Sequence, residues 1–156
     1  MRSGANEERF PSRKHPRLKA YDYSTPNYYF VTICTWQKLC LFGSPEKLNF
    51  RGEIARSGLL GIEKHFPNVR VDKYVIMPNH IHVILDLHTK GASLPDILGQ
   101  YKAFVTKEIH REEPGRKIWQ TSFHEHIIRS QQAYETIWLY IDSNPQNWEK
   151  DCFFAK

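Results

Sequence analysis

Hydrophobic and polar residues follow one another in patterns that predict three strands and a helix in the first half of the chain. Residues 28–36 form a run of aromatic and β-branched side chains, which is typical of a buried strand. Residues 51–66 place apolar side chains at steps of three and four, which indicates an amphipathic helix. Apolar residues then alternate over 69–77 and again over 80–87, and the Pro-Asn pair between these segments predicts a tight turn. We therefore expect the last two strands to form a hairpin.

The second half of the chain predicts two more helices and one more strand. Ser93 can cap a helix that runs from 94 to about 109, because a serine side chain accepts hydrogen bonds from the amides of a first helical turn. Residues 118–129 are typical of a strand, and the last helix starts near 132 and ends or kinks at Asn144–Pro145. The order β-α-β-β-α-β-α predicts an α+β protein with the antiparallel sheet of ferredoxin-like (RRM-like) folds and an extra C-terminal helix.

Length and composition predict a single globular domain. The chain has 156 residues, 40% of them hydrophobic, and it contains no apolar run long enough to span a membrane. Its start has no apolar segment behind the basic residues, so we expect a cytoplasmic protein. The three cysteines lack the spacing of metal ligands, which favours reduced thiols. A monomer and a homodimer are both compatible with these properties.

Positive charge is concentrated at the N-terminus. The net charge of the chain is +5, and the first 20 residues carry six basic and only two acidic side chains. Such an arm can contact the phosphates of a nucleic acid, or it can be a solvated terminus. The basic residues that we expect to contact a nucleic acid come from this arm and from the second predicted helix: Arg13, Lys14, Arg17, Lys19, Lys102 and Lys107.

Two pairs of histidines have the spacing of metal ligands on a strand. His80 and His82 share the polar face of the strand 80–87, because side chains alternate between the two faces. Neutral imidazole is a common metal ligand, so two neighbouring rings can bind one ion together. His124 and His126 have the same spacing in a later strand. Periodicity does not decide between the pairs, and either can also be exposed or hydrogen-bonded without a metal.

Several stretches resemble one known family. Residues 75–85 (VIMPNHIHVIL) resemble the histidine-hydrophobic-histidine motif of the HUH single-tyrosine transposases, in particular the REP-associated tyrosine transposase branch. A second match is WQ…F…H…IR over 119–129, followed by YIDSNP over 140–145. The opening stretch 17–32 is similar to the family's entry into its first strand. The resemblance therefore covers most of the chain, in the family's order.

This resemblance implies a metal-dependent transposase that cleaves and rejoins single-stranded DNA, at hairpin-flanked sites, through a covalent 5′-phosphotyrosine. Carried over by position, Tyr140 is the nucleophile, and His80, His82 and Asn144 hold Mg²⁺ or Mn²⁺. His126 also matches a family position, and we expect it to orient a metal ligand. The spacing agrees with this choice of tyrosine, because Asn144 follows Tyr140 by four residues and so shares its helix face.

The resemblance also divides the chain into parts. We expect a basic, flexible arm over 1–20, a single catalytic HUH-type domain over 21–150 and a short tail over 151–156. Two other functions stay open from the residues alone: a non-catalytic ferredoxin-like module that binds single-stranded nucleic acid, and a zinc hydrolase that uses both histidine pairs. Only the transposase would use the spacing of Tyr140 and Asn144.

Overall fold

A four-stranded antiparallel sheet is the centre of the structure, a computed structural model that describes residues 20–151, 153 and 154. The strands lie in the order β4-β5-β1-β6, and every neighbouring pair is antiparallel. Their bounds are β1 Asn27–Cys34, β4 Val69–Met77, β5 His80–Leu87 and β6 His124–Ile128. The predicted α+β class with a ferredoxin-like antiparallel sheet is therefore confirmed.

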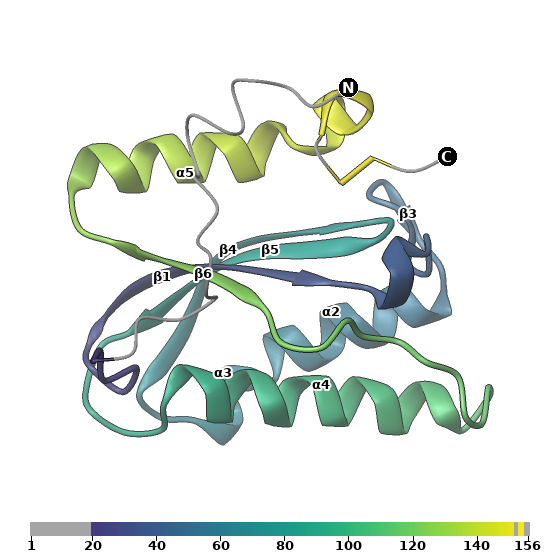
Figure 1. Ribbon diagram of the computed structural model, residues 1–156, viewed down its shortest axis with the longest axis horizontal. Coiled ribbons are helices and arrows are strands. Elements are labelled where there is room, and N and C mark those ends of the chain that lie inside the picture. The colour runs from purple at the N-terminus through teal and green to yellow at the C-terminus, as the bar shows by residue number, and fades with distance from the viewer. Residues whose placement is uncertain (1–19, 152, 155–156) are drawn as a thin grey trace.

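Helices cover both faces of this sheet (Figure 1). One face carries α2 (Phe50–Leu60), α3 (Ile62–His65) and α4 (Leu94–His110). The other face carries α5 (Gln131–Ser143), which leads into the short 3₁₀ helix η2 (Pro145–Lys150). Among the described residues, no helix has the length and apolar character needed to cross a membrane. The central strand β5 thus sends alternate side chains into two different layers.

Several element boundaries differ from the predicted ones. The single helix expected over 51–66 is divided at Gly61 into α2 and α3, in keeping with the weak helix propensity of glycine. The strand expected over 118–129 is formed only by β6, and its first part contributes one isolated bridge between Thr35 and Trp119. Three small elements between β1 and α2 were not predicted: η1 (Trp36–Lys38), β2 (Gly43–Ser44) and β3 (Lys47–Leu48).

Side-chain caps fix the starts of three helices. Asn49, Ser93 and Ser130 each accept a hydrogen bond from the backbone amide three residues later. The cap at Ser93 was predicted, and a cap of this kind contributes about 1 kcal/mol to helix stability. Ser130 determines where α5 begins, and this helix carries Tyr140.

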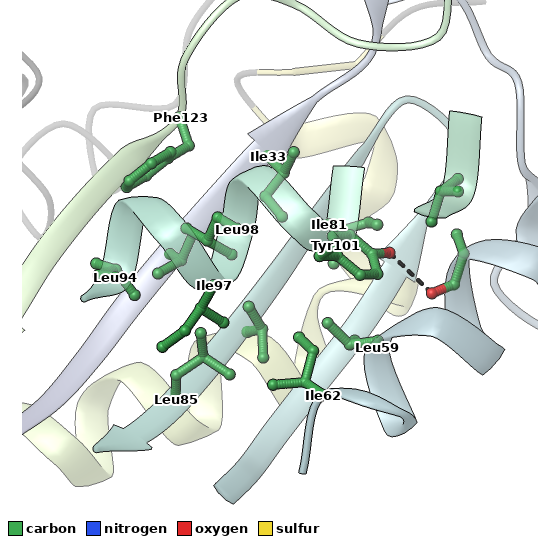
Figure 2. Close-up of a cluster of buried hydrophobic side chains, with 14 of the residues drawn as sticks. Ile33, Leu59, Ile62, Ile81, Leu85, Leu94, Ile97, Leu98, Tyr101 and Phe123 are labelled. Carbon is green, nitrogen blue, oxygen red and sulfur yellow. Dashed lines mark hydrogen bonds between the residues drawn. The ribbon is translucent and has the colours of Figure 1, made fainter. Parts of the chain in front are cut away.

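The main hydrophobic core lies between the sheet and the α2/α4 layer (Figure 2). Ile33 and Ile81 from the strands face Leu98 and Tyr101 from α4. The buried hydroxyl of Tyr101 donates a 2.8 Å hydrogen bond to the carbonyl of Ala55 in α2. This layer therefore supports the sheet from the side opposite α5.

A smaller apolar cluster joins α5 to the other face of the sheet. Its buried members come from β1, β5, β6 and α5, and they are Phe30, Ile84, Ile128, Ile137, Tyr140 and Ile141. The predicted nucleophile is thus itself part of the contact that holds its helix on the sheet.

Two glycines in helices allow a matched test of the packing around α2. A Cβ at Gly52 would lie 2.4 Å from the carbonyl oxygen of Phe42 and 2.9 Å from Cβ of Leu48. We expect Gly52→Ala to lower the free energy of unfolding by about 1–3 kcal/mol through overpacking. Gly99→Ala in α4, where nothing lies within 4 Å, should raise it by about 0.5–1 kcal/mol. Urea unfolding of both variants checks this, and equal midpoints would contradict it.

Candidate active site

The polar face of β5 points toward α5 and is buried there. His80 and His82 have exposed fractions of 0% and 1%, whereas Ile81 and Val83 point into the main core. The alternation predicted for this strand is therefore confirmed. The turn at Pro78–Asn79 begins β5 at His80, which sets the first imidazole at the end of the strand.

Asn79 in this turn fixes the tautomer of His80. The side-chain nitrogen of Asn79 donates to the carbonyls of Lys38 (3.2 Å) and Phe153 (2.7 Å), so its Oδ1 is left as an acceptor. Nδ1 of His80 lies 2.8 Å from this oxygen and therefore carries the proton. Nε2 of His80 is left with a lone pair that can bind a cation.

His82 lies between a neighbouring strand and the tyrosine of α5. Its Nδ1 is 2.8 Å from Oγ1 of Thr32 in β1, and its Nε2 is 3.5 Å from the hydroxyl of Tyr140. Burial lowers the pKa of His80 to about 3. Burial, and then the neighbouring His80, lower the pKa of His82 well below its ordinary value. Both imidazoles are therefore neutral at pH 7, which is the form that binds metal ions.

A carboxylate outside the predicted catalytic domain completes the cluster. Asp151 is 6% exposed, and its Oδ2 lies 3.7 Å from Nε2 of His80. The same oxygen accepts a 2.6 Å hydrogen bond from Nδ2 of Asn144, at the C-terminal end of α5. One ligand atom each from His80, His82 and Asp151 lie within 4.8 Å of one another. The expected ligand Asn144 is thus at the site together with a carboxylate that sequence reasoning missed.

Asp151 gave only a weak signal in the sequence. It follows Asn144 by seven residues, and η2 turns the chain back over the end of β5. Aromatic residues stand on both sides of it in the sequence, among them Trp148 and Phe153. In the structure their rings lie 5.9 Å and 4.6 Å from the ring of His80. A carboxylate is seldom buried without a partner. The position of Asp151 among aromatic residues is therefore the one sequence feature that could have indicated a buried, partnered carboxylate.

Two buried atoms of the cluster make no hydrogen bond within the described part of the chain: Nε2 of His80 and Oδ1 of Asn144. Because buried polar atoms nearly always have a hydrogen-bond partner, such atoms indicate a place for a ligand. Two imidazole nitrogens, a carboxylate and an amide oxygen form a donor set that suits a divalent cation. The residues therefore fit the Mg²⁺ or Mn²⁺ that the family resemblance implies.

Tyr140 faces the histidines from α5. Its side chain is buried, and its ring lies edge-on to the rings of Phe30 and His82, at centroid distances of 6.3 Å and 5.2 Å. Asn144, one helical turn further on, also points toward the sheet, in agreement with the spacing. All these groups belong to one chain, so a single chain brings the tyrosine and the candidate metal ligands together.

The second histidine pair lies on the same face of the sheet but on the edge strand β6, where both side chains are exposed. His124 is paired with Thr32, which is paired with His82, so the two histidine pairs are about two strand spacings, or about 10 Å, apart. Among the described residues, the candidate metal-binding group includes neither His124 nor His126. This arrangement disfavours a zinc hydrolase built from four converging histidines. His126 lies opposite Phe30, and the orienting role expected for it stays a prediction.

Two of the basic residues expected to contact DNA lie in the described part of the chain, and both are away from this cluster. Lys102 and Lys107 lie on α4, in the layer on the other side of the sheet from Tyr140. The ammonium group of Lys102 donates to the carbonyls of Gln120 and Ser122, at 2.9 Å each, and so holds the segment that precedes β6. The four residues of the arm lie outside the described part of the chain: Arg13, Lys14, Arg17 and Lys19.

A ferredoxin-like sheet with a buried histidine pair that faces a tyrosine on a helix defines a class of protein, the HUH single-tyrosine transposases. This chain belongs to the IS200-like transposase family, whose model matches residues 59–144. The matched segment includes both His80 and His82 as well as Tyr140 and Asn144. The resemblance inferred from the sequence is therefore confirmed, and the protein is a transposase of this family.

Individual relatives agree with this assignment. An uncharacterized protein of Haemophilus influenzae is 35% identical over an alignment of 168 positions, which spans 92% of this chain and 93% of the relative. A REP-associated tyrosine transposase bound to a REP hairpin has a similar fold, with a TM-score of 0.63 and 19% identity over 87% of this chain and 76% of the other. A putative transposase of Deinococcus radiodurans matches with a TM-score of 0.55 and 16% identity, over 90% and 100% of the two chains.

Proposed function

We propose that this transposase cleaves and rejoins single-stranded DNA by a metal-dependent transesterification in which Tyr140 is the nucleophile. One observation carries the proposal: the hydroxyl of Tyr140 lies 3.5 Å from Nε2 of His82, within a buried cluster that can hold a divalent cation. The family assignment supports the transposase activity, and the geometry supports this particular tyrosine. A non-catalytic DNA-binding module would have no use for a buried phenol beside candidate metal ligands.

His80, His82 and Asp151 would hold the cation, with Oδ1 of Asn144 as a further donor. The cation would supply Lewis-acid polarisation of the scissile phosphate and would stabilise the departing 3′-oxygen. Imidazole nitrogens favour Mn²⁺ over Mg²⁺, whereas carboxylate and amide oxygens suit both ions. We therefore propose Mn²⁺ or Mg²⁺, with stronger binding of Mn²⁺.

The reaction requires no external energy. The oxygen of Tyr140 forms a bond to phosphorus and loses its proton, the bond from phosphorus to the 3′-oxygen breaks, and a proton is taken up by that oxygen. The products are a 5′-phosphotyrosine and a free 3′-hydroxyl, so the phosphodiester is conserved and rejoining is the reverse step. Tyrosine has an ordinary pKa of about 10, so the neighbouring groups must favour loss of its proton. Thr32 and Asn79 hold the two imidazoles in place during both steps.

The substrate we propose is DNA that forms a hairpin. The support is the similar REP-associated tyrosine transposase, which was solved with a REP hairpin. To test the reaction, the protein is incubated with hairpin DNA labelled at either end, in Mn²⁺, and the products are separated on a denaturing gel. The 3′-labelled fragment should migrate with the protein, and the 5′-labelled fragment should be shortened and protein-free. Shortened fragments with no protein-bound label would contradict the proposal.

We also propose that the basic arm contributes to DNA binding. Deleting residues 1–19 removes six basic and two acidic side chains. When the logarithm of the binding constant is plotted against the logarithm of the salt concentration, the slope for single strands is about −0.7 per neutralised phosphate. Loss of three or four phosphate contacts should therefore make this slope less negative by about 2–3. Binding of one labelled hairpin across a salt series checks this, with the full chain as the reference. Adding Lys107→Gln to the truncated protein then shows whether Lys107 contributes to the slope that remains. An unchanged slope would mean that the arm is a solvated terminus.

A further inference from the structure

The position of α5 along the sheet is critical for the proposed reaction, because this helix carries Tyr140. The apolar contact beneath α5 is small, and hydrophobic contact has no preferred direction. Burial of this cluster alone therefore does not fix the position of α5 along its own axis relative to the sheet. Directional contacts between α5 and the sheet must supply this information.

A bulge in β4 provides such contacts. The pairing of β4 with β5 passes from Val71–Leu85 to Lys73–Ile84, which leaves Asp72 as an extra residue. Ile84 belongs to the cluster under α5, so Lys73, its partner, lies on the α5 face. The side chain of Asp72 also reaches α5. A regular strand would have sent these two consecutive side chains to opposite faces.

Both residues of the bulge bind α5, at points on either side of Tyr140. The hydroxyl of Tyr134 donates a 2.5 Å hydrogen bond to Oδ2 of Asp72, which raises the pKa of Tyr134 to about 12. Nζ of Lys73 lies 2.8 Å from Oδ1 of Asp142 and 3.8 Å from the centre of the Trp138 ring.

We propose that Asp72 and Lys73 form a clamp that positions Tyr140 along the sheet; this inference rests on the proposed function. Tyr134 and Asp142 are eight residues apart, or about 12 Å along the helix. Their partners, Asp72 and Lys73, are adjacent in β4. From this one place in the strand, one contact therefore reaches toward the N-terminal part of α5 and the other toward its C-terminal part. A slide of the helix either way stretches one of them, and the hydroxyl of Tyr140 stays beside His82.

The clamp is suited to positioning more than to stability. The side chain of Asp142 is 54% exposed, and ion pairs with one partner in solvent add little to folding free energy. A misplacement of a reacting group by about 1 Å, in contrast, can cost about 100-fold in rate. Asp72, Lys73 and Tyr134 are accordingly positioning residues, and none of them touches the reacting atoms.

The test is a single-turnover measurement of the covalent DNA adduct in Mn²⁺ with the Lys73→Met/Tyr134→Phe double variant. At saturating DNA the rate should fall about tenfold, while the DNA concentration at half-saturation changes less than about twofold. Lys73→Arg keeps a cation over Trp138 and beside Asp142, so it should retain the wild-type rate. The control is Glu113→Gln, which breaks an ion pair with Arg51 of α2, in the opposite layer; this pair is the better buried of the two, with Glu113 25% exposed against 54% for Asp142.

Each outcome decides the matter. A wild-type rate in the double variant overturns the clamp. The clamp is also overturned if Glu113→Gln loses as much rate as the double variant while the two have the same unfolding midpoint. A double variant that fails to fold is replaced by Lys73→Met alone, with an expected reduction of about threefold and the same criteria. If the wild-type chain itself forms no adduct, the proposed function is wrong and the clamp is refuted with it. If the wild-type chain reacts and the variants react equally, only the clamp is wrong.

Discussion

Tyr140→Phe is expected to abolish the covalent protein–DNA adduct completely. The substitution removes only the hydroxyl oxygen, which is the proposed nucleophile, and leaves the ring in contact with Phe30 and His82. The buried ring and its apolar packing are kept, so the unfolding midpoint and hairpin affinity should stay close to those of the wild type. A denaturing gel with labelled hairpin DNA measures the adduct.

Tyr74→Phe is the matched control for this substitution. Tyr74 lies on β4, packs against the main core on the other side of the sheet, and its hydroxyl accepts a hydrogen bond from Arg56. The control should form the adduct at the wild-type rate. An adduct in Tyr140→Phe at the wild-type rate would contradict the assignment and would direct attention to Tyr134, the other tyrosine of α5.

His80→Ala and His82→Ala are expected to lower the rate of metal-dependent cleavage by about 100-fold or more, because each removes a ligand of the proposed cation. Titration calorimetry with Mn²⁺ should show the corresponding loss of binding. Both side chains are buried, so each variant is first compared with the wild type in thermal unfolding. Asp151→Asn is the gentler companion, since it keeps the shape of the side chain and removes its charge.

His124→Ala is the control for the histidine variants. His124 is an exposed histidine of the same sheet face, on the edge strand β6. It should retain appreciable cleavage and full Mn²⁺ affinity. Loss of cleavage in His124→Ala together with activity in His80→Ala would mean that the wrong histidine pair had been assigned.

The sheet and the histidine strand were predictable because their patterns are strictly periodic. Apolar residues occupy every second position from Ile81 to Leu87, and the Pro-Asn turn before the strand leaves one possible register for His80 and His82. The helix with Tyr140 and Asn144 was also predictable, since its apolar stripe and the proline after Asn144 define its extent. Periodicity thus correctly predicted which residues of β5 and of α5 share a face.

Features that depend on a departure from periodicity were not predicted. The bulge at Asp72 shifts the faces of the residues that follow it in β4. Val75 therefore packs under α5, although simple alternation would place it with Val69 and Val71 in the main core. Asp151 reaches the site only because η2 folds back, and no local rule indicates such a path. The orientation of the Asn79 side chain, which fixes His80, depends on the carbonyl of Phe153, far away in the sequence. These features are set by tertiary contacts.

The most direct test is mass spectrometry of the protein after reaction with hairpin DNA in Mn²⁺, digestion of the bound DNA to a short nucleotide, and trypsin cleavage. Cleavage after Arg129 and Lys150 yields one peptide, 130–150, that contains both Tyr134 and Tyr140. Fragmentation of this peptide should place a phosphonucleotide on Tyr140, with Tyr134 unmodified and no adduct when the metal is removed by a chelator. A nucleotide on any other residue, or an adduct that forms equally well in the chelator, would contradict a metal-dependent reaction through Tyr140.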